Sequence, residues 1–292
     1  MIVFVSRIGH SYTLKALQAP DTGLTVRLMS YRALIDAKEL PRATYIFTDL
    51  DRIPLYWLRL AAHTWRQLRD GGLRVLNDPA RVLSRYGLLR RLHNAGYNRF
   101  NAYRAEDEVM PARWPAFLRC EGDHLGPVSD LIHTPEAMRQ AIDRAVADGL
   151  PLASLMIVEY AAEERIPGLF RKYGCFRVGP ARFAHTCVDD GHWMAKIGRP
   201  DLTPPELYAE EHRVVRDDPY GAALAPAFDI AGIDYGRADF GLVEGRPQLY
   251  EINTNPDIVF EDEHPVALRH RSYDLFRANY LSALRAIDTP DG

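Results

Sequence analysis

RADFGLVEGRPQLYEINTNPDI, residues 237–258, carries the strongest structural signal in this chain of 292 residues. Apolar runs on either side of a Glu-Gly pair predict a β-hairpin with strands at 237–242 and 246–253. Because side chains alternate along a strand, Glu251 and Asn253 share one face of the second strand. A carboxylate beside a carboxamide on so apolar a strand raises the question of what the two side chains bind.

The length of the hairpin turn decides whether Asp239 joins this face. A two-residue turn at 244–245 places Asp239 opposite Tyr250, on the other face of the hairpin. A three-residue turn at 243–245 with a left-handed glycine places Asp239 on the Glu251 face, diagonal to it. The sequence leaves both alternatives open.

With Asp239 on that face, two carboxylates and one amide oxygen converge. Oxygen donors of this kind suit Mg²⁺ or Mn²⁺, whereas zinc favours the His and Cys side chains that this segment lacks. Arg237 lies on the same face, and the turn at 253–258 can direct backbone N–H groups toward an anion. The alternative is a hairpin face whose acids are only solvated. The added cation and the turn favour a metal site formed by Asp239, Glu251 and Asn253.

The bulk composition is that of a globular protein, with 47% hydrophobic and 26% charged residues. A net charge of −3 gives no global field that would recruit nucleic acid or an acidic membrane. No stretch approaches the ~20 apolar residues that span a bilayer, and the start of the chain lacks the features of a signal peptide. Three cysteines without Cys-x-x-Cys spacing favour a reducing compartment, so we expect a cytoplasmic protein. The oligomeric state stays open, a homodimer included.

The first third of the chain predicts a small α/β unit. Buried strands are expected at 1–6, 24–31, 43–50 and 73–78. Helical periodicity predicts one helix at 54–72 and a second at 77–96 that begins with Asp78 and Pro79. We interpret the arginines of this second helix as a solvated face rather than a nucleic-acid patch: Arg81, Arg85, Arg90 and Arg91.

A polar, proline-containing connector at 105–115 precedes a second run of patterns. The predicted strands are 116–122, 154–161, 169–179 and 182–190, of which the last two form an antiparallel pair. The predicted helices are 134–149, 203–219 and 263–287. The chain therefore belongs to the α/β class, with separate α+β lobes.

The hairpin segment resembles the C-terminal metal-binding segment of the ATP-grasp superfamily, whose pattern is roughly Arg-x-Asp, a hairpin, then Glu-Ile-Asn-x-x-Pro. The resemblance implies an N-terminal pre-ATP-grasp α/β domain at 1–105 and an ATP-grasp domain at 106–292. The latter would comprise a central lobe at about 112–160 and a C-terminal lobe at about 161–292, with ATP between the two lobes. Most members join a carboxylate to an amine through an acyl phosphate, so the resemblance implies a ligase that uses ATP and Mg²⁺ or Mn²⁺.

The resemblance also implies roles for single residues. Asp239, Glu251 and Asn253 fall where the family holds its metals, with Glu251 bridging two ions. Arg237 falls where the family has an arginine that stabilises the transferring phosphoryl group or the tetrahedral adduct.

The strand that ends in VEYAAEE resembles the adenine-binding hinge of the family. The resemblance implies that Glu159 accepts from the adenine amino group and that the backbone of Tyr160 and Ala161 completes the adenine edge. Glu163 or Glu164 would then bind ribose hydroxyls. The alternative is a core strand followed by a solvated acidic turn.

Basic residues on the following strands match the phosphate-binding positions of the family. Lys172 and Arg177 alternate with aromatic residues on one strand, and Lys196 ends the next. Only four of the 36 basic residues are lysines, and Lys172 and Lys196 are two of them. This scarcity favours a function for both over a surface position.

The central lobe departs from the family pattern. Arg119 stands where the family usually has a lysine, and the glycine-rich loop over the phosphates is reduced to residues 122–126. Arginine can bind the phosphates through two parallel hydrogen bonds, so nucleotide binding is still expected. His124 in this loop could touch a phosphate.

Three functions remain open from the sequence. The leading one is a ligase for a small-molecule or peptide carboxylate and an amine or thiol; the others are a small-molecule kinase and an inactive nucleotide-binding protein. The chain has no Gly-x-x-x-x-Gly-Lys phosphate loop, Gly-x-Gly-x-x-Gly fingerprint or Gly-x-Ser-x-Gly elbow. The acidic run at 261–264 could attract a cationic amine, although a solvated loop is the simpler interpretation.

Overall fold

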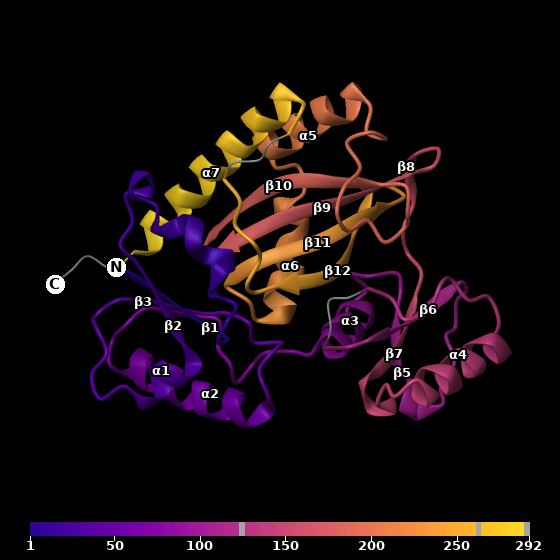
Figure 1. The fold of residues 1–292 in the computed structure, drawn as a ribbon, viewed down its shortest axis with the longest axis horizontal. Coiled ribbons are helices and arrows are strands. Elements are labelled where there is room, and N and C mark those ends of the chain that lie inside the picture. Colours follow the sequence, from indigo (N-terminus) through magenta and orange to yellow (C-terminus); the bar gives the residue numbers. More distant parts are fainter. Residues whose placement is uncertain (123–125, 261–263, 289–292) are drawn as a thin grey trace.

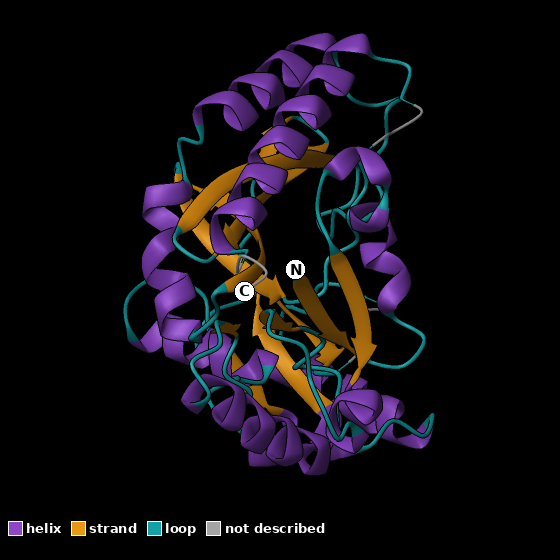
Figure 2. Cartoon of the chain, turned by 90° about the vertical axis from the view of Figure 1, so that its left-hand side faces the viewer, coloured by secondary structure: helices purple, strands orange, loops and turns teal. Residues whose placement is uncertain are grey.

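The computed structural model describes residues 1–122, 126–260 and 264–288, which form three sheets surrounded by helices (Figures 1 and 2). Short 3₁₀ turns connect several elements: η1 (Ser11–Gln18), η2 (Pro20–Thr22), η3 (Ala105–Asp107) and η4 (Leu152–Ser154). No described helix is both long enough and apolar enough to cross a bilayer.

The N-terminal sheet is parallel, with strand order β2-β1-β3-β4. Its strands are β1 (Ile2–Ser6), β2 (Val26–Ser30), β3 (Thr44–Phe47) and β4 (Val75–Leu76). Val3 and Val5 pack toward the helices α1 (Tyr31–Asp36) and α2 (Leu55–Asp70). Ile2 and Phe4 pack in a cluster with residues of the C-terminal half. Burial of both faces explains why the strands are continuous apolar runs rather than alternating ones.

The central sheet is antiparallel, with order β5-β7-β6. It consists of β5 (Ala102–Arg104), β6 (Ala116–Cys120) and β7 (Leu155–Glu159). One face packs on α4 (Pro135–Ala147), and the other contributes Phe117 and Val158 to a second cluster with α3 (Arg85–Asn94). The expected domain boundary at 105 falls after β5, which is already paired in this central sheet.

The C-terminal sheet is also antiparallel, with order β10-β9-β11-β12 and β8 beside β9. Its strands are β8 (Glu164–Ile166), β9 (Leu169–Val178), β10 (Ala181–Asp190), β11 (Tyr235–Val243) and β12 (Arg246–Asn253). One face packs on α6 (Gly221–Ala231), and the other packs on α7 (Ala267–Ile287). The helix α5 (Pro205–Asp217) contacts α7 and β10. Figure 1 shows α7 crossing the sheet toward the N-terminal domain.

The helix predicted at 77–96 begins later than expected, at Arg85. The N-cap is Ser84, whose hydroxyl accepts from the Gly87 N–H at 3.2 Å. Asp78 caps only a local turn, by accepting from the Ala80 N–H at 2.9 Å. Asn77 is left-handed (φ 61°) and buried, and its side chain is bound between two sheets. These contacts hold the segment out of the helix.

Candidate functional site

The β11–β12 hairpin places Asp239 and Glu251 directly opposite each other. The turn is the two-residue alternative, because Val243 pairs with Arg246 and both turn residues are left-handed. The three-residue alternative is therefore wrong. A bulge at Tyr250 nevertheless shifts the register between Leu249 and Glu251. Directly opposed residues share a face, so the bulge achieves what the longer turn was expected to do.

The bulge also changes the orientation of Tyr250. In a regular strand, alternation would place Tyr250 on the opposite face from Glu251, but Tyr250 lines the same cavity as Glu251. Its hydroxyl donates to the Ala161 carbonyl at 2.9 Å. Gly241 leaves room for the ring, because a Cβ at that position would overlap the Tyr250 hydroxyl.

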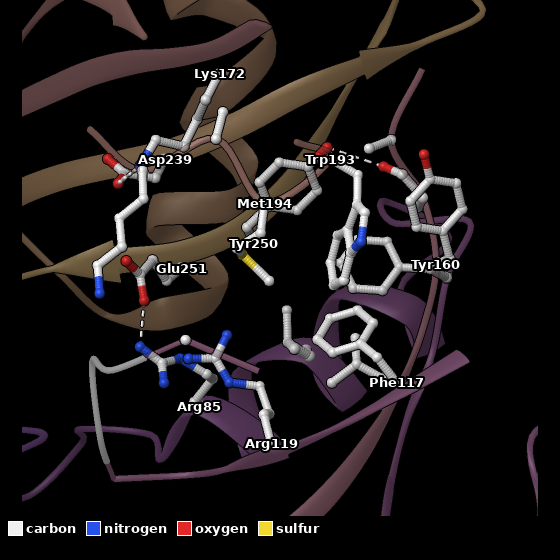
Figure 3. A pocket seen from close by; sticks show the side chains of 18 of the residues that line it. Arg85, Phe117, Arg119, Tyr160, Lys172, Trp193, Met194, Asp239, Tyr250 and Glu251 are labelled. Carbon is white, nitrogen blue, oxygen red and sulfur yellow. Dashed lines mark hydrogen bonds and ion pairs between the residues drawn. The ribbon is translucent and has the colours of Figure 1, made fainter. Parts of the chain in front are cut away.

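A cavity of about 310 Å³ lies between the central and C-terminal sheets. Figure 3 shows aromatic side chains on one side of it and charged side chains on the other. Most of the residues predicted for the site line this cavity: Arg119, Glu159, Tyr160, Ala161, Lys172, Lys196, Arg237, Asp239, Glu251 and Asn253. The structure therefore brings together side chains that lie far apart in the sequence.

Asp239 forms the centre of the charged side. Arg237 Nε donates to its Oδ1 at 2.6 Å, and Lys172 Nζ donates to its Oδ2 at 3.2 Å. The Asp239 residue is 3% exposed. Burial raises the pKa of Asp239, but the Arg237 guanidinium and the Lys172 ammonium more than offset it, so the pKa lies well below its usual range. Asp239 is thus an ionised carboxylate that already holds two cations.

Glu251 holds a third cation, Arg85 (Figure 3). The Arg85 guanidinium is buried, and it also donates to the Glu121 carbonyl at 3.1 Å. The interpretation of the α3 arginines as a solvated face is therefore wrong for Arg85. The signal was available, because Arg85, Leu88 and Leu92 follow helical spacing and are all buried on one stripe.

Asn253 begins the polar turn that follows β12. Its Oδ1 accepts from the Asn255 N–H at 2.9 Å. The Ile258 N–H donates to the Thr13 carbonyl at 2.9 Å. These two backbone groups of the turn therefore bind protein atoms and do not supply the anion site expected there.

The three predicted metal ligands present a suitable donor set. Two carboxylates and one amide oxygen line one cavity, and hard oxygen donors match Mg²⁺ or Mn²⁺. No cluster of three or more His, Cys, Asp or Glu side chains with metal-binding geometry occurs within residues 1–122, 126–260 and 264–288. The set consists of Asp239, Glu251 and one amide, and both carboxylates hold basic side chains.

Aromatic rings line the other side of the cavity (Figure 3). The ring centroids of Phe117 and Trp193 are 4.8 Å apart, and those of Tyr160 and Trp193 are 5.8 Å apart. Trp193 and Met194 come from the loop after β10, and the sequence marked neither residue as functional, although it marked Lys196 in the same loop. Such a wall suits a planar ring system, because stacking needs only an aromatic face.

The Glu159 carboxylate binds groups of the protein itself rather than facing the aromatic wall. Its carboxylate accepts from the Asn101 N–H at 3.0 Å, the Tyr103 hydroxyl at 2.8 Å and the Arg113 N–H at 3.1 Å. The Tyr160 N–H donates to the Pro115 carbonyl at 2.9 Å. The expected adenine contacts of the Glu159 carboxylate and the Tyr160 N–H are therefore already taken by the fold.

The two glutamates expected at the ribose lie outside the lining of this cavity. Glu163 accepts from the Glu244 N–H at 3.0 Å, so it binds the tip of the hairpin. Glu164 belongs to β8 and accepts from the Gly168 N–H at 3.0 Å. Both side chains are exposed, as the solvated-turn alternative predicts.

Arg177 also lies outside the cavity. Its Nη1 donates to Asp229 at 2.6 Å, and its guanidinium lies 6.0 Å from the Phe228 ring centroid. Lys172 and Arg177 are five residues apart, and an odd separation places them on opposite faces of β9. Because Arg177 points away from the cavity, the expectation that it binds the phosphates is wrong.

Lys196 lies in a loop rather than at a strand end, because β10 stops at Asp190. Arg119 keeps the expected position on β6, and both side chains line the cavity. His124 and residues 261–263 lie outside the described residues.

Comparison with solved structures identifies the architecture. The chain is similar to D-alanine–D-alanine ligase from Bacillus anthracis complexed with ATP, with a TM-score of 0.54 at 10% identity over 98% of this chain and 97% of that chain. It is also similar to a RimK domain ATP-grasp protein from Sphaerobacter thermophilus, with a TM-score of 0.50 at 14% identity over 97% of this chain and 98% of that chain. The chain has the ATP-grasp fold.

The ATP-grasp fold confirms the fold class expected from the hairpin motif. No family model matches the sequence, and a search of curated proteins found no match. Sequence identities of 10–14% establish a shared ATP-grasp architecture and no more than that.

Proposed function

We propose that the protein is an ATP-dependent ligase that activates a carboxylate as an acyl phosphate and transfers the acyl group to an amine. One observation carries the proposal: a single cavity joins an aromatic wall to a cluster of basic side chains around paired carboxylates. The basic side chains are Arg52, Arg85, Arg119, Lys172, Lys196 and Arg237. An excess of cations suits a polyphosphate together with a substrate carboxylate.

The nucleotide would lie along the length of the cavity. Its base would stack against Phe117 and Trp193, beside the backbone of Ala161. Arg119 and Lys196 would bind the phosphates. The ATP-bound state of the similar ligase from Bacillus anthracis supports nucleotide use in this fold.

Asp239, Glu251 and Asn253 would hold Mg²⁺ or Mn²⁺, because they present oxygen donors from two adjacent strands. A bound divalent ion would neutralise the charge that develops between the β- and γ-phosphates.

The residues of this chain would then serve two displacements. In the first, a substrate carboxylate oxygen forms a bond to the γ-phosphorus as the bond to the β–γ bridging oxygen breaks, giving acyl phosphate and ADP. Arg237 and Lys172 would stabilise the equatorial oxygens. In the second, the amine nitrogen forms a bond to the acyl carbon, the bond from that carbon to the phosphate oxygen breaks, and phosphate leaves with the proton that the amine gives up. A thiol could replace the amine.

Melting experiments with ATP and Mg²⁺ test the proposal first. At ATP ~100 times its dissociation constant, binding adds about 2.7 kcal/mol to the free energy of unfolding. Acyl phosphate formation is then tested with a panel of carboxylic acids and hydroxylamine, which converts an acyl phosphate to a hydroxamate. A kinase would instead release ADP with a stable phosphorylated product and no hydroxamate.

Glu251→Gln provides the sharpest variant. We expect it to remove the Mg²⁺-dependent part of the melting shift and to lower kcat by about 10²-fold or more. The matched control is Glu244→Gln, because Glu244 is exposed and pairs with Arg99 outside the cavity. An Mg²⁺-independent melting shift, or full turnover in Glu251→Gln, contradicts the proposal.

A further inference from the structure

A second polar network adjoins the cavity where two parallel strands of the N-terminal sheet end. His10 follows β1, and Asp49 and Arg52 follow β3. In open parallel sheets, ligands bind beyond the carboxyl ends of the strands. Arg52 lines the same cavity as Asp239, Glu251 and Asn253.

Asp49 is the fixed point of this network. It is completely buried and adopts a left-handed backbone conformation (φ 56°). Its carboxylate accepts from His10 Nδ1 at 2.6 Å, from the Arg7 N–H at 2.9 Å and from Asn255 Nδ2 at 3.0 Å. A strained backbone persists only where its surroundings enforce it, and strain of this kind clusters at ligand sites.

The contacts of His10 determine its tautomer. Arg52 Nη1 lies 3.2 Å from His10 Nε2, and a guanidinium can only donate, so Nε2 accepts. The ring proton then lies on Nδ1, from which it is donated to Asp49. The two hydrogens of Asn255 Nδ2 bind the His10 carbonyl and Asp49, each at 3.0 Å, so they do not compete for Nδ1.

Arg52 is only partly satisfied by this network. Its Nε is buried, lies 3.9 Å from Asp49 Oδ1, and has no hydrogen-bond partner among the described residues. Its side chain is 18% exposed. A buried guanidinium N–H without an acceptor costs free energy, and an anion in the cavity would relieve that cost.

The network is joined directly to the metal-ligand strand. Thr254 Oγ1 accepts from the Leu50 N–H at 3.3 Å, and Asn255 binds Asp49. Both residues follow Asn253 without a break in the chain. The Arg52 end of the cavity therefore lies at the Asn253 end of the charged cluster rather than at the aromatic wall.

We propose that Arg52 binds the substrate carboxylate that is phosphorylated, and that His10 and Asp49 are positioning residues that hold the Arg52 guanidinium. This inference rests on the proposed function, because it assigns the acid subsite of that reaction. Each carboxylate oxygen accepts one of two parallel hydrogen bonds from Arg52, and one of these oxygens attacks the γ-phosphorus through a remaining lone pair. The bonds that form and break are those of the acyl phosphate step described under the proposed function, and Arg52 keeps all its protons.

The test measures hydroxamate formation from the panel acid that wild-type protein uses best. Arg52→Met is expected to raise the KM for the acid roughly ten- to a hundredfold, with the KM for ATP and the Mg²⁺–ATP melting shift unchanged. Arg52→Lys should recover part of the loss, because it keeps the charge but not the planar pair of donors. The control is Arg66→Met on the exposed face of α2.

His10→Ala tests the positioning role. It is expected to raise the KM for the acid with little change in the KM for ATP, and His10→Gln, which keeps an acceptor, should have a smaller effect. A purely structural role would instead lower the melting temperature and change both KM values together, and that result overturns the positioning role.

Two failures are distinguishable. If wild-type protein forms no hydroxamate with any acid, the proposed function fails and this inference fails with it. If wild-type protein is active and Arg52→Met retains the wild-type KM for the acid, the acid subsite is wrong while the proposed function stands.

Discussion

At Asp239, burial raises the pKa of the carboxyl group and the neighbouring basic side chains lower it, and the lowering effect is the larger of the two. The folded-state pKa therefore lies below the unfolded value, which is about 3.9 for aspartate. A carboxyl shifted in this direction contributes stability that is present above the unfolded pKa and is lost as the pH falls through the folded pKa. The ionic cluster should thus be intact at neutral pH and should weaken only in acid.

Asp239→Asn is expected to cost about 2–4 kcal/mol at neutral pH, because it leaves the partly buried Arg237 and Lys172 without their counter-ion. The deficit should stay constant from neutral pH down to about 5 and should shrink as the pH falls below about 4, because the unfolded wild-type chain then takes up a proton at Asp239 that the folded protein does not. Urea unfolding across this pH range measures both effects. Asp21→Asn, which breaks an exposed pair with Arg277, is the control and should cost less than about 1 kcal/mol. Equal costs for the two variants would contradict the prediction.

At the scale of single elements, the β11–β12 hairpin contributes to both the charged side and the aromatic side of the cavity. The bulge at Tyr250 puts that ring and Glu251 on one cavity, and Gly241 supplies the space for the ring. The hydroxyl of Tyr250 then binds Ala161 at the end of the central sheet. The hairpin therefore links the charged cluster to the aromatic wall.

Gly241→Ala is expected to displace Tyr250 from the cavity wall and to break its hydrogen bond to Ala161. We expect a loss of about 1–3 kcal/mol in the free energy of unfolding and weaker ATP binding, because the added methyl overpacks the strand. Calorimetric titration with ATP and urea unfolding measure the two effects. Gly87→Ala in α3 is the matched control, since its Cβ meets only ordinary contacts, and it should be neutral or slightly stabilising. If Gly241→Ala binds ATP with unchanged affinity, the Tyr250 part of the hairpin does not contribute to nucleotide binding.

Elements with a strong periodic pattern were predictable from the sequence, because one pattern decides both the element type and the buried face. The hairpin, α2, α4 and α7 are of this kind. The bulge was not predictable, since Tyr250 carries none of the glycine or turn signals that mark a bulge. Arg85 was missed for another reason: its charge outweighed its place on an apolar helical stripe in our interpretation. Trp193 lies in a loop without periodicity.

At the scale of the whole molecule, Asn77 joins the N-terminal sheet to the C-terminal sheet. Its Nδ2 donates to the Phe47 carbonyl at 2.9 Å and to the Tyr235 carbonyl at 2.8 Å. Its Oδ1 accepts from the backbone N–H groups of Asp234 and Tyr235. Contacts over 158 residues of sequence separation leave no local pattern, so this junction could not be predicted from the chain alone.

Asn77→Ala is expected to lower the free energy of unfolding by more than about 3 kcal/mol, because four backbone groups, three of them buried, lose their partner. Asn77→Gly should recover about 1 kcal/mol of this loss, since glycine adopts the left-handed conformation without strain. Urea unfolding of both variants, with the exposed Asn94→Ala as control, tests the prediction. If neither Asn77→Ala nor Asn77→Gly lowers the free energy of unfolding appreciably, the Asn77 junction does not hold the sheets together.

The pairing of Asp239 and Glu251 with basic side chains has a thermodynamic consequence. If Asp239 and Glu251 hold the metal as proposed, a divalent ion alone would displace Lys172, Arg237 and Arg85 from their carboxylates with no anion to receive them. A nucleotide alone would have to draw the same basic side chains away and leave two carboxylates without a counter-charge. Each ligand removes the obstacle to the other, so the two affinities are coupled, and by reciprocity each must strengthen the other by the same factor. The proposed site is therefore expected to bind the metal–nucleotide pair more tightly than either component by itself.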